Sequence, residues 1–153
     1  MEQVILVDER DRALGVEEKL RAHRDGGMLH RAFSIFIRDP AGRVLLRSRR
    51  KYHFGGLWTY ACYGHPRPGE ATDRAAHRRL REELGFDVPL SEVSAFVYRA
   101  EDPGSNLTEH EYDHIFLGEL WALASWCART GVGRPILRCA TAETSPDART
   151  NWR

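Results

Sequence analysis

The chain has 153 residues, the size of one domain, and 42% of them are hydrophobic against 29% charged. With a mean hydropathy of -0.52, this composition is typical of a globular domain and argues against disordered, collagen-like and membrane-spanning chains. Lysines and arginines number 23 and acidic residues 22, so the net charge of +1 gives no overall basic field for nucleic acid or anionic membranes. Any anionic ligand must therefore be bound by a local cluster of cations.

The cysteines and the N-terminus indicate the compartment. Cys62, Cys127 and Cys139 are too few and too unevenly placed for a disulfide scaffold. The Met-Glu-Gln-Val start has an early acid and no basic stretch, so we expect no secretory signal. No apolar stretch reaches the ~18 residues of a membrane span, and we expect a cytoplasmic protein.

Short runs of β-branched and aromatic residues, bounded by turn signals, predict a mixed α/β chain with short connections. The predicted strands, in chain order, are Val4–Val7, Ala32–Ile37, Val44–Leu46, Val93–Tyr98 and Ile115–Leu120. Glu17–His23 is a candidate for a short helix, although its periodicity is weak.

One longer helix is predicted between Gly69 and Gly85. Ala76, Leu80 and Leu84 repeat at i, i+4 and i+8, which places them on one face. Acidic residues lie near the start of this segment, and Gly85 can end the helix in the left-handed conformation.

The character of the chain changes after Leu120. We expect residues 1–120 to form the catalytic domain and residues 121–153 to be an atypical segment, partly disordered or divergent, because the latter have little period of either kind. A shift of the reading frame near Leu120 is the alternative explanation.

The most specific local pattern is Gly64-x5-Glu70-x7-Arg78-Arg79-Leu-Arg-Glu-Glu83-Leu-Gly85. A loop, a helix and a loop with this spacing set carboxylates on one helical face, where they can hold Mg²⁺ against a diphosphate. The spacing resembles the Nudix box, in which a Glu normally follows the first Arg. Arg79 takes that place here, and its charge argues against simple diphosphate hydrolysis. The structural alternative is a solvated helix with fortuitous acids.

Histidines and acids of a second kind surround this pattern. His23 and His30 are seven apart ahead of a predicted strand, His65 follows Gly64, and Glu109–Glu111 precede the last predicted strand. Imidazoles with carboxylates suit Zn²⁺ or Mn²⁺. A lone histidine is more often an ordinary surface or core residue, so the interpretation rests on the group.

Together these motifs resemble the type I isopentenyl-diphosphate isomerases, which are built on the Nudix fold. The resemblance runs from Val4 to about Leu120. It rests on Glu18-Lys19-x3-His23, Leu29-His30-Arg-Ala-Phe33-Ser34, Gly56-Leu57-Trp58-Thr59, Gly64-His65-Pro66-x2-Gly69-Glu70, Arg78-Arg79-Leu-Arg-Glu-Glu83-Leu-Gly85, Tyr98-Arg99-Ala100 and Glu109-His-Glu111.

The resemblance implies a single-domain α/β (α+β) fold, with a Nudix-like mixed sheet packed between helices. It implies one divalent metal, Zn²⁺, Mn²⁺ or Mg²⁺, with the ligands His23, His30, His65, Glu109 and Glu111. It also implies that Glu83 helps to hold Mg²⁺ on the substrate diphosphate. The phosphates would be neutralised by Lys19, Arg49, Lys51 and Arg79.

The family reaction is a 1,3-proton shift from the isopentenyl to the dimethylallyl skeleton. An alkene is protonated to a tertiary carbocation, and a proton is then removed from the neighbouring carbon on the other side. The resemblance implies that Glu111, polarised by the metal and backed by Tyr98, acts on one face. A cysteine two residues before the histidine of Gly-His-Pro acts on the other, and here that residue is Tyr63.

Tyr63 leaves the second proton carrier open. Cys62 is its neighbour, but in an extended segment the two side chains point to opposite faces. Tyrosine has a reference pKa of ~10 against ~8.5 for cysteine, so it is the weaker acid. A cationic metal site nearby can lower the pKa of a phenol and allow it to relay a proton.

The leading interpretation is a metal-dependent, isopentenyl-diphosphate isomerase-like enzyme that performs acid–base chemistry on the alkene of a prenyl diphosphate. The alternatives are a prenyl-diphosphate cyclase or an isomerase of a longer chain, started by the same protonation. Two further alternatives are a Nudix diphosphate hydrolase, which Arg79 disfavours, and a non-catalytic prenyl-diphosphate binder. The expected partner is a small molecule, and the sequence specifies neither the oligomeric state nor the metal.

Overall fold

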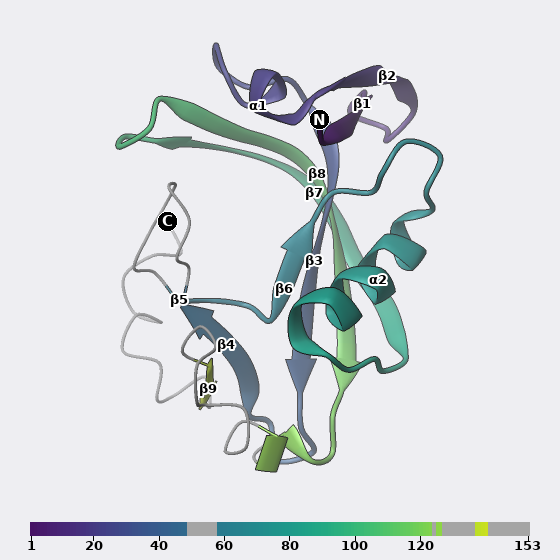
Figure 1. The fold of residues 1–153 in the computed structure, drawn as a ribbon, viewed down its shortest axis with the longest axis vertical. Coiled ribbons are helices and arrows are strands. Elements are labelled where there is room, and N and C mark those ends of the chain that lie inside the picture. Colours follow the sequence, from purple (N-terminus) through teal and green to yellow (C-terminus); the bar gives the residue numbers. More distant parts are fainter. Residues whose placement is uncertain (49–57, 124, 127–136, 141–153) are drawn as a thin grey trace.

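Strand β3 (His30–Arg38) organises the sheet, because four other strands pair with it. The computed structural model describes residues 1–48, 58–123, 125–126 and 137–140. Among these residues, nine strands join one mixed sheet (Figure 1). The prediction of a mixed α/β chain is therefore confirmed.

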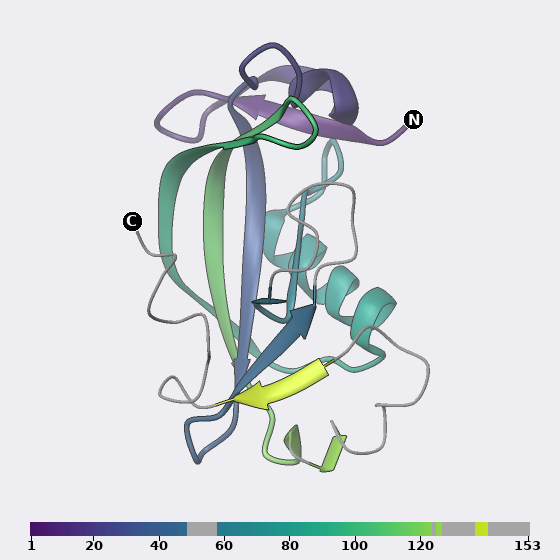
Figure 2. The ribbon, with the colours of Figure 1, turned by 90° about the vertical axis from the view of Figure 1, so that its left-hand side faces the viewer.

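A long hairpin lies on one side of β3. Strand β8 (Leu107–Glu119) runs parallel to β3, and β7 (Leu90–Asp102) pairs with β8 antiparallel. In Figure 2 the three strands stand side by side. Both hairpin strands extend well beyond the predicted Val93–Tyr98 and Ile115–Leu120, because their pairing continues through polar residues that interrupt the apolar signal.

The N-terminal elements cross one end of the sheet (Figure 2). Strand β1 (Gln3–Val7) pairs with β2 (Ala13–Glu18), which leads into the short helix α1 (Lys19–Ala22). The carboxylate of Glu18 caps α1 by accepting hydrogen bonds from two backbone N–H groups. Only part of Glu17–His23 is helical, because Glu17 and Glu18 are strand residues of β2 and pair with β1.

Four short strands complete the sheet on the other side of β3. Strand β4 (Val44–Ser48) pairs with β5 (Trp58–Thr59) and with β9 (Leu137–Ala140), and β6 (Cys62–Gly64) pairs with β3. Strand β9 is the described part of the chain beyond residue 126. The expectation for 121–153 as a whole lies mostly outside the described residues. None of the described helices has the length and apolar character to cross a membrane.

Helix α2 (Thr72–Leu84) packs on one face of this sheet, as the sequence predicts. Its Ala76, Leu80 and Leu84 are buried against alternate residues of β3, which include the fully buried Phe33. Gly85 ends the helix with φ of 75° and donates its N–H to the carbonyl of Arg81. The opposite face of β3 carries His30 and Ser34 together with Ala32 and Phe36.

The core under α2 predicts a large effect of truncation at Leu80, which is fully buried. Leu80→Ala should lower the free energy of unfolding by about 2–5 kcal/mol, because a cavity adds to the lost transfer energy. The same substitution at Leu14, which is 69% exposed on β2, is the matched control and should have little effect. Urea denaturation measures both, and equal effects would contradict this packing.

Candidate metal centre

Three side chains of the centre come from one row across the sheet. Tyr98 on β7 and His30 on β3 are both register partners of Glu111 on β8. Directly paired residues point to the same face of a sheet. The sequence placed Glu109–Glu111 ahead of the last strand, and this was wrong. They lie inside β8, because pairing with β7 extends through them.

The structure brings four of the five predicted ligands together. The candidate ligand atoms of His23, His30, His65 and Glu111 all lie within 4.8 Å of one another. The Nε2 atoms of His30 and His65 are 3.2 Å apart. Oε1 of Glu111 lies 3.0 Å from Nε2 of His65 and 3.6 Å from Nε2 of His30. All four side chains are buried or nearly so.

Hydrogen bonds to backbone carbonyls fix the orientation of two imidazole rings. Nδ1 of His23 donates to the carbonyl of Lys19, and Nδ1 of His30 donates to that of Met28, each at 2.7 Å. A carbonyl can only accept, so in the neutral ring the lone pair is on Nε2, the usual arrangement of metal-binding histidines. Nε2 of His30 thus faces Glu111 Oε1, and a divalent cation among these atoms would bind both.

The protonation states also suit metal binding. Burial lowers the pKa of His65 to about 4 and also lowers the pKa of His23, so both rings are neutral near pH 7. Burial alone would raise the pKa of Glu111, but its contacts with His30 and His65 outweigh this and hold the pKa well below its ordinary value. Neutral imidazoles and an ionised carboxylate are the forms that bind a divalent metal.

Glu109 lies outside the group of four but close to it. Its carboxylate accepts from the Tyr98 hydroxyl at 3.3 Å, while Glu111 Oε2 accepts from the same hydroxyl at 2.5 Å. Burial, together with the negative charges of these two carboxylates, raises the pKa of Tyr98 above its ordinary value. Tyr98 therefore keeps its proton and holds it against the metal-side carboxylate.

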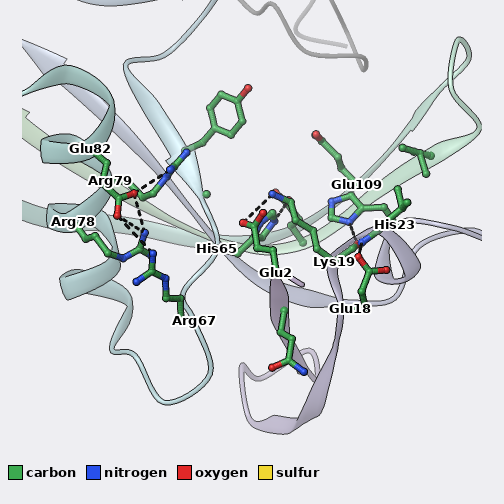
Figure 3. A pocket seen from close by; sticks show the side chains of 16 residues that line it. Glu2, Glu18, Lys19, His23, His65, Arg67, Arg78, Arg79, Glu82 and Glu109 are labelled. Carbon is green, nitrogen blue, oxygen red and sulfur yellow. Dashed lines mark hydrogen bonds and ion pairs between the residues drawn. The ribbon is translucent and has the colours of Figure 1, made fainter.

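A pocket of about 440 Å³ opens beside this centre and is shown in Figure 3. Two predicted phosphate-binding residues, Lys19 and Arg79, line it. Glu83, the predicted Mg²⁺ ligand, forms ion pairs with Arg79 and with Arg47. The predictions for Arg49 and Lys51 lie outside the described residues.

Tyr63 lines the same pocket, whereas Cys62 is fully buried in the core under α2. The predicted opposition of the two side chains is confirmed. The guanidinium of Arg47 lies 5.6 Å from the centre of the Tyr63 ring, and the Tyr60 ring meets it edge-on at 5.8 Å. Tyr63 thus contacts both a cation and a second aromatic ring.

Sequence reasoning missed a buried acid on this face. Asp113 is 3% exposed, and burial raises the pKa of its carboxyl to about 7. It accepts a hydrogen bond of 2.7 Å from Ser34, and its Oδ1 has no hydrogen-bond partner among the described residues. The signal was present, because Glu109, Glu111 and Asp113 alternate along one strand.

Removal of one ligand tests the metal centre. His65→Ala should reduce bound divalent metal after dialysis and lower the melting temperature of the metal-loaded protein, since metal binding contributes to folding free energy. His77→Ala, at a surface helix position paired with Asp87, is the matched control. Elemental analysis and thermal unfolding measure both. Equal metal content in the two variants would contradict the assignment.

Comparisons with known proteins identify the family. A model described as the NUDIX domain matches residues 28–125. Isopentenyl-diphosphate Delta-isomerase of Serratia proteamaculans is 56% identical over 119 residues, which cover 76% of this chain and 65% of that protein. Isopentenyl-diphosphate Delta-isomerase 2 of Aromatoleum aromaticum is 45% identical over 154 residues, covering 99% of this chain and 71% of that protein. The chain spans about two thirds of the length of these relatives.

A likeness to a solved structure concerns the fold alone. DR0079 from Deinococcus radiodurans has a TM-score of 0.61 and 19% sequence identity, over 99% of this chain and 100% of that one. The Nudix-like fold predicted from the sequence, and the resemblance to the isomerases, are both confirmed. The chain carries a Nudix domain and belongs to the isopentenyl-diphosphate delta-isomerase family.

Proposed function

We propose that the chain converts isopentenyl diphosphate to dimethylallyl diphosphate by a 1,3-proton shift through a tertiary carbocation. One observation carries the proposal. The Glu111 carboxylate contacts His30 and His65 with one oxygen and the protonated Tyr98 hydroxyl with the other. It lies beside a pocket that Tyr63 and basic side chains also line. The printed names of the relatives, isopentenyl-diphosphate Delta-isomerases, support the same chemistry.

The first proton is held between Tyr98 and Glu111. The Tyr98 hydroxyl donates to Glu111 Oε2 at 2.5 Å, so this pair presents a proton at a fixed place. A divalent cation bound by His23, His30, His65 and Glu111, with Glu109 as the further predicted ligand, would supply positive charge that makes the pair a stronger acid. General acid catalysis of this kind contributes ~10²–10⁴-fold.

The second proton carrier is Tyr63. It lines the same pocket as Glu111, so an alkene placed between the two presents one face to each residue. The guanidinium of Arg47 lies over its ring and helps to hold the side chain in the pocket. In its phenolate form, Tyr63 can take a proton from the carbon next to the carbocation.

Recognition of the diphosphate rests on Lys19 and Arg79, with Arg49 and Lys51 as further expected contacts outside the described residues. Glu83 would hold Mg²⁺ on the same group. Arg79 occupies the position of the Nudix box at which a hydrolase of this fold has a carboxylate. Because Arg79 is a cation, isomerisation is favoured over hydrolysis. The substrate is a small molecule.

Tyr63 substitutions test which product forms. Tyr63→Phe should abolish conversion of isopentenyl diphosphate, because the phenol proton carrier is lost, and Tyr63→Cys should preserve or raise it. Tyr112→Phe is the control, since its ring lies against His114, away from the pocket. NMR of products formed in D₂O measures conversion and deuterium uptake. A Tyr63→Phe variant that still turns over, and forms a ring or a longer-chain isomer, would instead favour the cyclase or long-chain alternative.

Charge removal at the pocket tests diphosphate recognition. Lys19→Ala and Arg79→Ala should each weaken binding of isopentenyl diphosphate by roughly 1.5–3 kcal/mol, the range for a charge-assisted hydrogen bond. Arg38→Ala, whose ion pair with Glu119 is exposed at the far end of β3, should leave it unchanged. Isothermal titration calorimetry gives the affinities. Unaltered binding in both pocket variants would remove this part of the proposal.

A further inference from the structure

Three arginines converge on one carboxylate in the pocket wall. Nη1 of Arg79 and Nη1 of Arg78 lie 3.1 and 3.2 Å from Oε2 of Glu82, and Nη2 of Arg67 lies 3.7 Å from Oε1. All four residues line the pocket, and Figure 3 shows them on the side opposite Lys19 and His23. We call these three arginines the arginine cradle.

The fold builds the cradle from two elements. Arg78, Arg79 and Glu82 are three or four residues apart on α2 and share a face, whereas Arg67 comes from the loop after β6. Glu70 fixes that loop. It accepts from the backbone N–H of Arg67 and forms two hydrogen bonds of 2.8 Å with the guanidinium of Arg78. Glu70 therefore positions Arg78 and the backbone of Arg67 independently of Glu82.

Gly64 lies directly against Arg79. A Cβ atom built at this glycine would lie 3.4 Å from Nε of Arg79, an ordinary van der Waals contact, and 3.3 Å from the ring of Phe33. Arg79 lines the pocket together with Tyr63.

Three carboxylates pair with the three arginines of the cradle, and one of them, Glu83, is shared with Arg47. Glu70 satisfies Arg78, and Arg79 is shared between Glu82 and Glu83. The side chain of Arg67 is 66% exposed and that of Glu82 is 39% exposed, so their pair is solvated and weak. Glu82 can turn out into water at little cost, which would leave a forked set of guanidinium donors facing the pocket.

We propose that Glu82 occupies the place of a substrate phosphate, and that Arg67 joins Arg79 in binding that phosphate when Glu82 turns away. This inference rests on the proposed function and assigns two further residues to its diphosphate side. A phosphate carries more charge and more acceptor oxygens than a carboxylate, and planar guanidinium forks match it with paired hydrogen bonds. Diphosphate binding is then an exchange of an internal anion for an external one.

Binding of inorganic pyrophosphate to the Mg²⁺-loaded full chain tests the exchange without alkene chemistry. Glu82→Gln should tighten binding roughly 3- to 10-fold, because the competing charge is gone, and Arg67→Gln should weaken it by a similar factor. Arg81→Gln on the same helix, where Arg81 pairs with Asp87, and Glu101→Gln at the hairpin tip are the matched controls. Calorimetric titration at one ionic strength measures all four.

Glu82→Asp separates exchange from simple repulsion. The shorter side chain keeps the charge but withdraws it from the cradle, so exchange predicts tighter binding than wild type, whereas repulsion alone predicts no change. Unchanged binding in Glu82→Asp, or weaker binding in Glu82→Gln as expected of a Mg²⁺ ligand, would overturn the proposal. Turnover of isopentenyl diphosphate is measured separately, so its absence would reject the isomerase function while these affinities still decide the role of Glu82.

Discussion

The register between β3 and β8 is the constraint on which the rest of the centre depends. His30 stands directly opposite Glu111, and Glu111 directly opposite Tyr98, so one row of the sheet carries a ligand, a shared carboxylate and a phenol. A slip of one residue would turn each side chain to the other face. The apolar residues of β3 that pack under α2 oppose such a slip, because Phe33, Ile35 and Ile37 would then face the pocket. Core packing on one face of the sheet thus fixes the register that brings His30, Glu111 and Tyr98 together on the other face.

This arrangement concentrates polar groups where burial is unfavourable. His30 on β3 is fully buried, and Glu111 and Asp113 on β8 are nearly so. An uncompensated buried carboxylate destabilises a fold unless it is paired or coordinates a cation. A bound metal would therefore serve folding and catalysis together, since the same charge that stabilises Glu111 also raises the acidity of the Tyr98–Glu111 pair.

The elements that could be predicted were those with a strong local signal. The four-residue apolar repeat of α2 and its terminal glycine predicted that helix. The alternation of side chains along a strand predicted that Cys62 and Tyr63 point in opposite directions. The extent of β7 and β8 could not be predicted, because their outer halves are polar and are held by pairing between residues far apart in the chain. Arg47 was missed as a neighbour of Tyr63 for the same reason, since its side chain reaches Tyr63 on β6 and Glu83 on α2 only in the folded chain.

Cys62 can report on the packing of α2 against the sheet. Its thiol lies on the α2 side of β6 with no exposed surface, next to the tyrosine that lines the pocket on the other side. A thiol reagent can reach it only when α2 and β6 separate, so its labelling rate reports the free energy of that local opening. Compounds that inactivate an enzyme by alkylating a pocket cysteine would find a phenol at this position, and the neighbouring sulfur would be protected for as long as the helix stays packed on the sheet.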